Sequence, residues 1–165
     1  SRRPGVGPQR VAAQRPDGGG VVTAVDVIVP CYNYGRFLGR CVGSLLVQEG
    51  CDVRVLVIDD CSTDDSLMTA RGIAATDPRV RLIAHERNRG HIATYNEGID
   101  WVGSPYMLLL SADDMLAPGA LRRATALWYD RQSWRRVQRN AMRQDFSWQR
   151  SADLYLRLYT SSIPS

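Results

Sequence analysis

The chain has 165 residues, 44% of them hydrophobic, which is enough for one ordinary domain with a buried core. Its net charge is +4, and all 21 basic residues are arginines, spread along the chain except for a concentration between residues 131 and 150. This spread gives no specific support for nucleic-acid binding, and no apolar run is long enough for a membrane span or a signal peptide.

The elements predicted along the chain alternate between strands and helices. Residues 1–24, rich in glycine, proline and arginine, predict a disordered leader because they offer little apolar surface to bury. The expected strands are 25–30 (ended by Pro30), 53–58, 80–84 and 106–110. The expected helices between them are 36–47, a segment that starts within 62–65 and is closed by Pro78, and 92–102. This alternation predicts an α/β fold with a mainly parallel sheet. Residues 119–160 predict helices only, over 121–127, 134–142 and 148–159.

A pair of aspartates directly follows two of the expected strands. Asp59 and Asp60 follow strand 53–58, and Asp113 and Asp114 come soon after strand 106–110. Adjacent carboxylates repel each other and resist burial, so a cation or a ligand with hydrogen-bond donors would stabilise them. Ligands of open α/β sheets bind at the strand ends. The two pairs therefore indicate a binding site, and the alternative is two polar turns without a ligand.

Four motifs follow one another in the part of the chain with strand–helix alternation. They are Val27–Tyr34, Val57–Asp64, Asn88–Gly90 with Asn96–Gly98, and Leu110–Asp114. In this order and spacing they resemble the family 2 glycosyltransferases of the GT-A fold. The resemblance covers residues 25–127 and implies a Rossmann-like half that binds a nucleotide sugar. The expected organisation is a leader over 1–24, this domain over 25–127 and a helical tail over 128–165.

The resemblance implies transfer of a sugar, with inversion, from a nucleotide-diphosphate donor such as a UDP- or GDP-sugar to an unknown acceptor. Pro30 would free the backbone after the first strand to face the donor, and Tyr32 would pack against its base. Asn33 would form a hydrogen bond near the base. Asp60, with Asp59 nearby, would accept a hydrogen bond from an N–H of the base. The alternatives are that Tyr32 packs at the start of a helix and that the two aspartates cap a turn.

The resemblance also implies a divalent metal, Mg²⁺ or Mn²⁺, which would neutralise the charge of the departing diphosphate. Asp113 is the expected ligand and Asp114 its support, because Ser111 stands at the first position of the family's acidic triplet. Asn88 and Gly90 would approach the phosphates, and glycine allows close backbone contact there.

Three questions stay open at this stage. Residues 119–165 offer no acidic residue that can be assigned as the catalytic base, so the chain is interpreted as an apparently truncated enzyme or, alternatively, as an inactive remnant that binds nucleotide sugars or other partners. Residues 133–160 resemble the end of bacterial glycogen and starch synthases.

The four cysteines lack the close pairs of a zinc site and predict reduced thiols of a cytoplasmic protein, with peripheral attachment to the inner membrane face left open.

Overall fold

The computed structural model describes residues 23–144, 150, 152–153 and 156–157. The chain divides into two compact units, Ser1–Thr125 and Ala126–Ser165. Most of the expected leader and of the expected helix over 148–159 lies outside the described residues.

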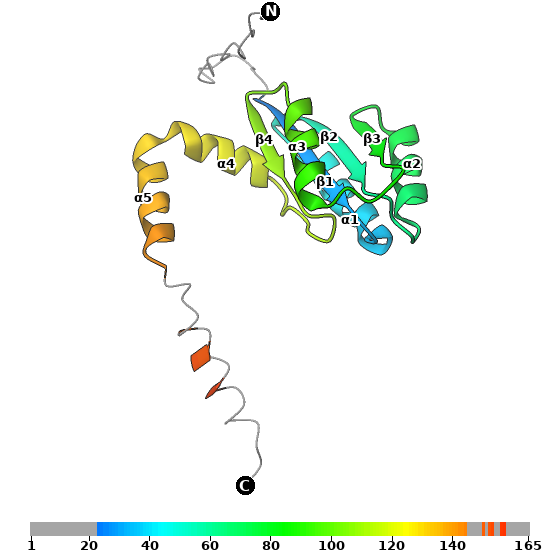
Figure 1. The fold of residues 1–165 in the computed structure, drawn as a ribbon. Coiled ribbons are helices and arrows are strands. Elements are labelled where there is room, and N and C mark those ends of the chain that lie inside the picture. The colour runs from blue at the N-terminus through cyan, green and yellow to red at the C-terminus, as the bar shows by residue number, and fades with distance from the viewer. Residues whose placement is uncertain (1–22, 145–149, 151, 154–155, 158–165) are drawn as a thin grey trace, which may run out of the picture. The chain divides into compact units, whose positions relative to one another are not determined.

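The first unit is built on a sheet of four parallel strands in the order β3-β2-β1-β4 (Figure 1). The strands are β1 (Thr23–Cys31), β2 (Cys51–Asp59), β3 (Val80–Ala84) and β4 (Tyr106–Leu109). The four predicted strands and the parallel sheet are therefore confirmed. β1 and β2 are the central strands and are buried along most of their length, which explains why apolar residues predominate in both.

The prediction that the first strand ends at Pro30 was wrong. β1 begins two residues earlier, within the expected leader, and continues to Cys31, whose carbonyl accepts a hydrogen bond of 2.9 Å from the backbone N–H of Asp60. Neighbouring residues of a strand point their backbone groups to opposite sides, so Pro30 points toward β4. The paired residues of β1 and β4 end at Ile28 and Leu109. Proline lacks the N–H group that would be the next donor to β4 after the Ile28 carbonyl accepts from the Leu110 N–H. It therefore ends the pairing with β4, while the pairing with β2 continues to Cys31.

Helices cover both faces of the sheet. α1 (Gly35–Leu46) and α2 (Ser66–Thr76) pack on one face, where Leu38, Val42 and Ala70 join the core. α3 (His91–Trp101) covers the other face. The three layers confirm the α/β fold class.

α3 lies unusually close to the sheet at Gly98. A Cβ atom at this position would lie 2.4 Å from Cγ2 of Ile28 in β1. The absence of a side chain at Gly98 therefore sets how closely α3 approaches β1.

A buried carboxylate joins three segments near the beginning of β4. Asp26 is fully buried and accepts hydrogen bonds from the guanidinium of Arg54 (2.7 and 2.8 Å), from the backbone N–H groups of Gly103 and Ser104 (2.8 and 2.9 Å) and from the Ser104 hydroxyl (2.7 Å). Burial opposes ionisation, but these donors outweigh it and lower the pKa of Asp26 to about 2. The carboxylate therefore stabilises the turn that leads into β4.

Two helices follow the sheet, α4 (Ala120–Tyr129) and α5 (Arg131–Met142). α5 is capped by Asp130, whose carboxylate accepts hydrogen bonds from the backbone N–H groups of Gln132 and Ser133. α4 and α5 correspond to the helices expected over 121–127 and 134–142. Among the residues that the structure describes, no helix is long and apolar enough to cross a membrane.

Candidate functional site

The carboxyl ends of the parallel strands surround a cavity of about 410 Å³. The chain runs from β1 to β2 and β3, and returns to place β4 on the other side of β1, so its direction across the sheet reverses there. Such a switch point opens a crevice between neighbouring loops, which is where open α/β sheets bind ligands. The cavity is lined by residues from the end of β1 (Pro30, Tyr32), the end of β2 (Asp60), the loop before α3 (Asn88, Gly90) and the turn after β4 (Ser111).

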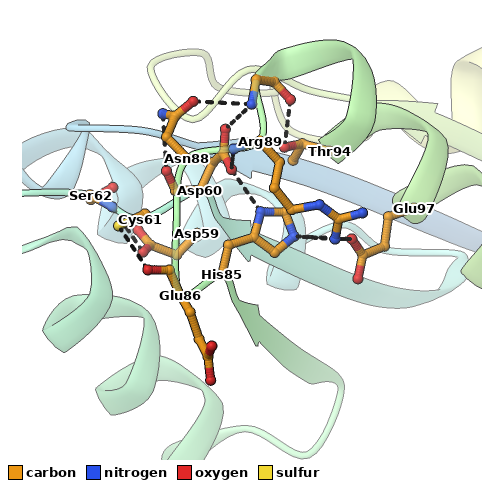
Figure 2. Close-up of polar contacts among 11 residues, drawn as sticks. Asp59, Asp60, Cys61, Ser62, His85, Glu86, Asn88, Arg89, Thr94 and Glu97 are labelled. Atoms are coloured by element: carbon orange, nitrogen blue, oxygen red, sulfur yellow. Dashed lines mark hydrogen bonds and ion pairs between the residues drawn. The ribbon is translucent and has the colours of Figure 1, made fainter.

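Asp60 lies in the cavity wall, and its carboxylate contacts three other residues (Figure 2). Its residue is 4% exposed, and its Oδ1 lies 2.7 Å from Nδ1 of His85 and 2.7 Å from the backbone nitrogen of Arg89. Its Oδ2 accepts a hydrogen bond of 2.8 Å from the N–H of Gly90. Burial opposes ionisation of Asp60, but the hydrogen bonds from His85 and from the two backbone groups outweigh it and lower its pKa. Asp60 is therefore ionised at neutral pH, oriented by three contacts, and able only to accept further hydrogen bonds.

The loop between β3 and α3 provides the donors that hold Asp60. Gly90 has φ +80°, a conformation that glycine adopts without strain, and it is the N-cap residue of α3. The Asn88 side chain connects this turn to β2, because its amide donates to the Asp60 carbonyl (3.2 Å) and its oxygen accepts from the Gly90 N–H (3.0 Å). Asn88 and Gly90, both expected near the phosphates, thus lie beside the carboxylate expected near the base.

Asp59 and Asn33 do not line this cavity. The Asn33 side-chain oxygen accepts hydrogen bonds from the backbone N–H (2.7 Å) and hydroxyl (3.2 Å) of Thr63, so it stabilises the loop after β2. Asp59 is 1% exposed, and its Oδ2 accepts from the backbone N–H of Ser62. Its Oδ1 is buried without a hydrogen-bond partner among the described residues. The structure therefore separates the first aspartate pair into one residue at the cavity and one beneath the loop.

The second aspartate pair lies on the turn after β4. Ser111 lines the cavity, its hydroxyl donates to Asp113, and its carbonyl accepts a hydrogen bond of 3.0 Å from the N–H of Asp114. Both aspartates are exposed and neither lines the cavity. Within the described part of the chain, no three histidine, cysteine, aspartate or glutamate side chains lie close enough together to hold a metal ion.

Sequence reasoning missed His85 and Glu97. The His85 imidazole is 4% exposed and lies between Asp60 and Glu97, with Nε2 3.0 Å from Oε2 of Glu97. Glu97 belongs to one of the four motifs, but no role was predicted for it. A single histidine in a polar loop has no periodicity or spacing that predicts such a position, so only the fold reveals it.

Comparisons with known proteins agree with this geometry. The family model described as Glycosyl transferase family 2 matches residues 26–160. The succinoglycan biosynthesis protein ExoO of Rhizobium meliloti is 42% identical over 102 residues, which cover 62% of this chain and 29% of that protein. The family model also includes the whole tail segment 133–160, whose resemblance to glycogen and starch synthases stays a prediction.

Two solved structures are similar in fold. TarS 1–349 of S. aureus in complex with UDP-GlcNAc has a TM-score of 0.60 and 25% identity, over 67% of this chain and 32% of that one. The mannosyltransferase PcManGT of Pyrobaculum calidifontis, in complex with GDP-Man and Mn²⁺, has a TM-score of 0.54 and 24% identity, over 58% of this chain and 29% of that one. The chain therefore spans about a third or less of the length of each of these three proteins.

Proposed function

Because the chain belongs to glycosyl transferase family 2, we propose that its cavity binds the nucleotide of a UDP- or GDP-sugar, as the donor half of an inverting glycosyltransferase. The observation that supports this most directly is the state of Asp60. It is an ionised carboxylate in the cavity wall, held by His85, Arg89 and Gly90. Uracil and guanine each carry a ring N–H donor on the edge used for base pairing, and such a donor matches a fixed acceptor.

The other cavity residues suit the remaining parts of a nucleotide. Tyr32 is 45% exposed and offers an aromatic face to a base. Gly90 has no side chain between the backbone and an approaching phosphate, and the first N–H groups of α3 follow it. The UDP-GlcNAc in the similar TarS structure makes UDP the first compound to test.

The turn after β4 is the proposed metal site. Carboxylate and hydroxyl oxygens are the ligands that Mg²⁺ and Mn²⁺ take, and Ser111, Asp113 and Asp114 supply them there. Two carboxylates do not complete six-fold coordination, so this turn fits a metal that takes its other ligands from the diphosphate and water. When bound, the metal would stabilise the negative charge of the leaving diphosphate. No observation within the described residues favours the inactive module over the transferase.

The test of nucleotide binding is calorimetric titration of UDP and GDP into the whole chain and into Asp60→Asn. Asn at this position keeps the size of the side chain and removes the negative charge of the group that would accept the hydrogen bond from the base. A hydrogen bond to a charged group contributes about 1.5–3 kcal/mol, so we expect Asp60→Asn to weaken binding about tenfold or more. Asp52→Asn is the matched control, because Asp52 is exposed near the beginning of β2, at the opposite end of the strand, and should leave binding unchanged. Equal binding by wild type and Asp60→Asn would contradict the proposal.

The metal prediction has its own variant and its own control compound. We expect Mn²⁺ to strengthen UDP binding by the wild type and to have no effect on Asp113→Ala. Binding of uridine, which lacks the diphosphate, should be the same in both proteins. If Mn²⁺ strengthens UDP binding equally in the two proteins, Asp113 is not its ligand.

A further inference from the structure

α5 carries a concentration of arginines that do not line the cavity of the proposed donor site. Residues 131–143 contain no acidic side chain and five arginines, which are Arg131, Arg135, Arg136, Arg139 and Arg143. All five are exposed, and within the described part of the chain none of them forms an ion pair. The acidic residue just before the helix, Asp130, caps its first turn. α5 therefore presents concentrated positive charge to the solvent.

Three of these arginines form a row along one side of the helix. Arg131, Arg135 and Arg139 are spaced by four residues, which places their side chains one above another, and together with Gln132 they line a hollow of about 340 Å³. Like charges at this spacing repel each other, so an anionic partner would stabilise the row. Guanidinium groups are weakly hydrated and donate two parallel N–H groups to phosphate oxygens. The row is therefore suited to bind phosphate groups.

Another side of α5 carries an apolar stripe. Trp134, Val137 and Ala141 follow one another at spacings of three and four residues, which places them on one side of the helix. Val137 is 42% exposed, and no residue of α5 itself is buried. The ring of Trp128, at the end of α4, packs edge to face against Trp134 with their centroids 5.1 Å apart. A face rich in arginine and a stripe that contains tryptophan are typical of helices that lie in a membrane interface.

We propose that α5 attaches the protein to membrane surfaces that contain anionic phospholipids. The helix would lie in the plane of the surface, with Trp134 and Val137 at the boundary between headgroups and acyl chains and with the arginines extended toward the lipid phosphates. A nucleic acid is the other phosphate-rich partner that a row of arginines binds, but it would leave the apolar stripe in water. A lipid surface uses both sides of the helix, so the observations favour the membrane.

The measurement is co-sedimentation of the whole chain with vesicles of phosphatidylcholine, either alone or with about a third of phosphatidylglycerol. We expect binding to the anionic vesicles and none to the neutral ones. An arginine near an anionic surface raises the affinity about fivefold, so the double variant Arg135→Gln, Arg139→Gln should bind about 25-fold more weakly. An increase in salt from about 50 mM to about 500 mM should also release the protein, because it screens the attraction. Equal binding to the two kinds of vesicle, or to neither, would overturn the proposal.

Two matched double variants show whether the charge of α5 causes the binding. Arg135→Lys with Arg139→Lys keeps both charges, so it should bind within about threefold of the wild type. Arg40→Gln with Arg71→Gln removes the same amount of charge from exposed positions on α1 and α2, and it should bind as the wild type does. Far-ultraviolet circular dichroism checks that all variants keep their helices. If the variant in α1 and α2 loses as much vesicle binding as the glutamine variant in α5, overall charge attracts the protein and the proposal is wrong.

The apolar stripe distinguishes a membrane from a nucleic acid. Val137→Ser should weaken binding to anionic vesicles about threefold, because less apolar surface leaves water, and should not change binding to an RNA oligonucleotide. The emission of Trp134, identified by its loss in Trp134→Phe, should shift to shorter wavelength on the vesicles and be quenched by lipids brominated in their acyl chains. Binding to RNA but not to vesicles, or vesicle binding that Val137→Ser leaves unchanged, would contradict the proposal. None of these measurements uses a nucleotide, so their result is independent of the proposed function.

Discussion

Replacement of Asp26 by Asn tests the physical reasoning about the fold most directly. The fully buried carboxylate accepts from Arg54, Gly103 and Ser104. Its pKa falls from the ordinary 3.8 to about 2 in the folded protein, which corresponds to about 2 kcal/mol of folding free energy at neutral pH. An Asn amide would also turn its NH₂ group toward backbone donors and leave one of them without an acceptor, which costs about 1 kcal/mol. We therefore expect Asp26→Asn to lower the free energy of unfolding by about 3 kcal/mol at pH 7.

The same pKa determines how this loss depends on pH. A carboxylate whose pKa is lowered by folding stabilises the folded state at pH values above the pKa that it has in the unfolded chain. This contribution disappears as the pH falls to the pKa that the group has in the folded protein. The difference between wild type and Asp26→Asn should thus be constant above about pH 5 and shrink between about pH 4 and pH 2. Urea unfolding followed by far-ultraviolet circular dichroism measures it, with Asp52→Asn as the exposed control expected within about 0.5 kcal/mol of wild type. A variant equal to wild type at pH 7, or a difference that does not shrink in acid, would refute the role given to Asp26.

Two further predictions concern packing and thiol chemistry. Gly98→Ala should destabilise the protein by about 2 kcal/mol, because the added Cβ would lie 2.4 Å from Ile28, whereas Gly72→Ala, with nothing within 4 Å of the added atom, should stabilise it by about 0.5–1 kcal/mol. Urea unfolding distinguishes them, and similar effects of the two substitutions would contradict the close packing of α3. Burial, with the nearby acidic groups, raises the pKa of the Cys41 thiol to about 12, so iodoacetamide at pH 8 should label the partly exposed Cys61 and spare Cys41 in the folded protein. Peptide mass spectrometry measures both thiols, and equal labelling of the two would show that Cys41 is accessible.

The strand and helix pattern was predictable because it depends on neighbouring residues. The apolar runs that became β1 to β4 are separated by segments of helical periodicity, and a parallel sheet requires this alternation. The end of β1 was not predictable in the same way. Proline normally interrupts a strand, but the backbone of Pro30 faces β4, so it ends only the pairing of β1 with β4, and the pairing with β2 continues to Cys31.

The location of the candidate site was predictable from the sequence, but the contacts among its residues were not. Sequence reasoning located it at the strand ends, where the structure shows the cavity, and it named Asp60 as the acceptor in the cavity wall. It also treated Asp59 and Asn33 as parts of that site, but the fold places both against the loop after β2. Adjacent residues at a strand end point to opposite faces, so a pair of aspartates cannot both face one cavity unless the backbone turns between them.

The sequence by itself determined the order of the elements, the parallel sheet and the two acidic turns, because short-range patterns of apolar and polar residues suffice for these. Only the tertiary structure decided that Asp60 is held ionised by His85, Arg89 and Gly90, and that Glu97 of α3 contacts the same imidazole. His85 and Asp60 are 25 residues apart, and their contact exists because β2 and β3 lie side by side with their carboxyl ends at the same edge. Contacts of this kind arise from the packing of whole elements, and local sequence patterns do not contain them.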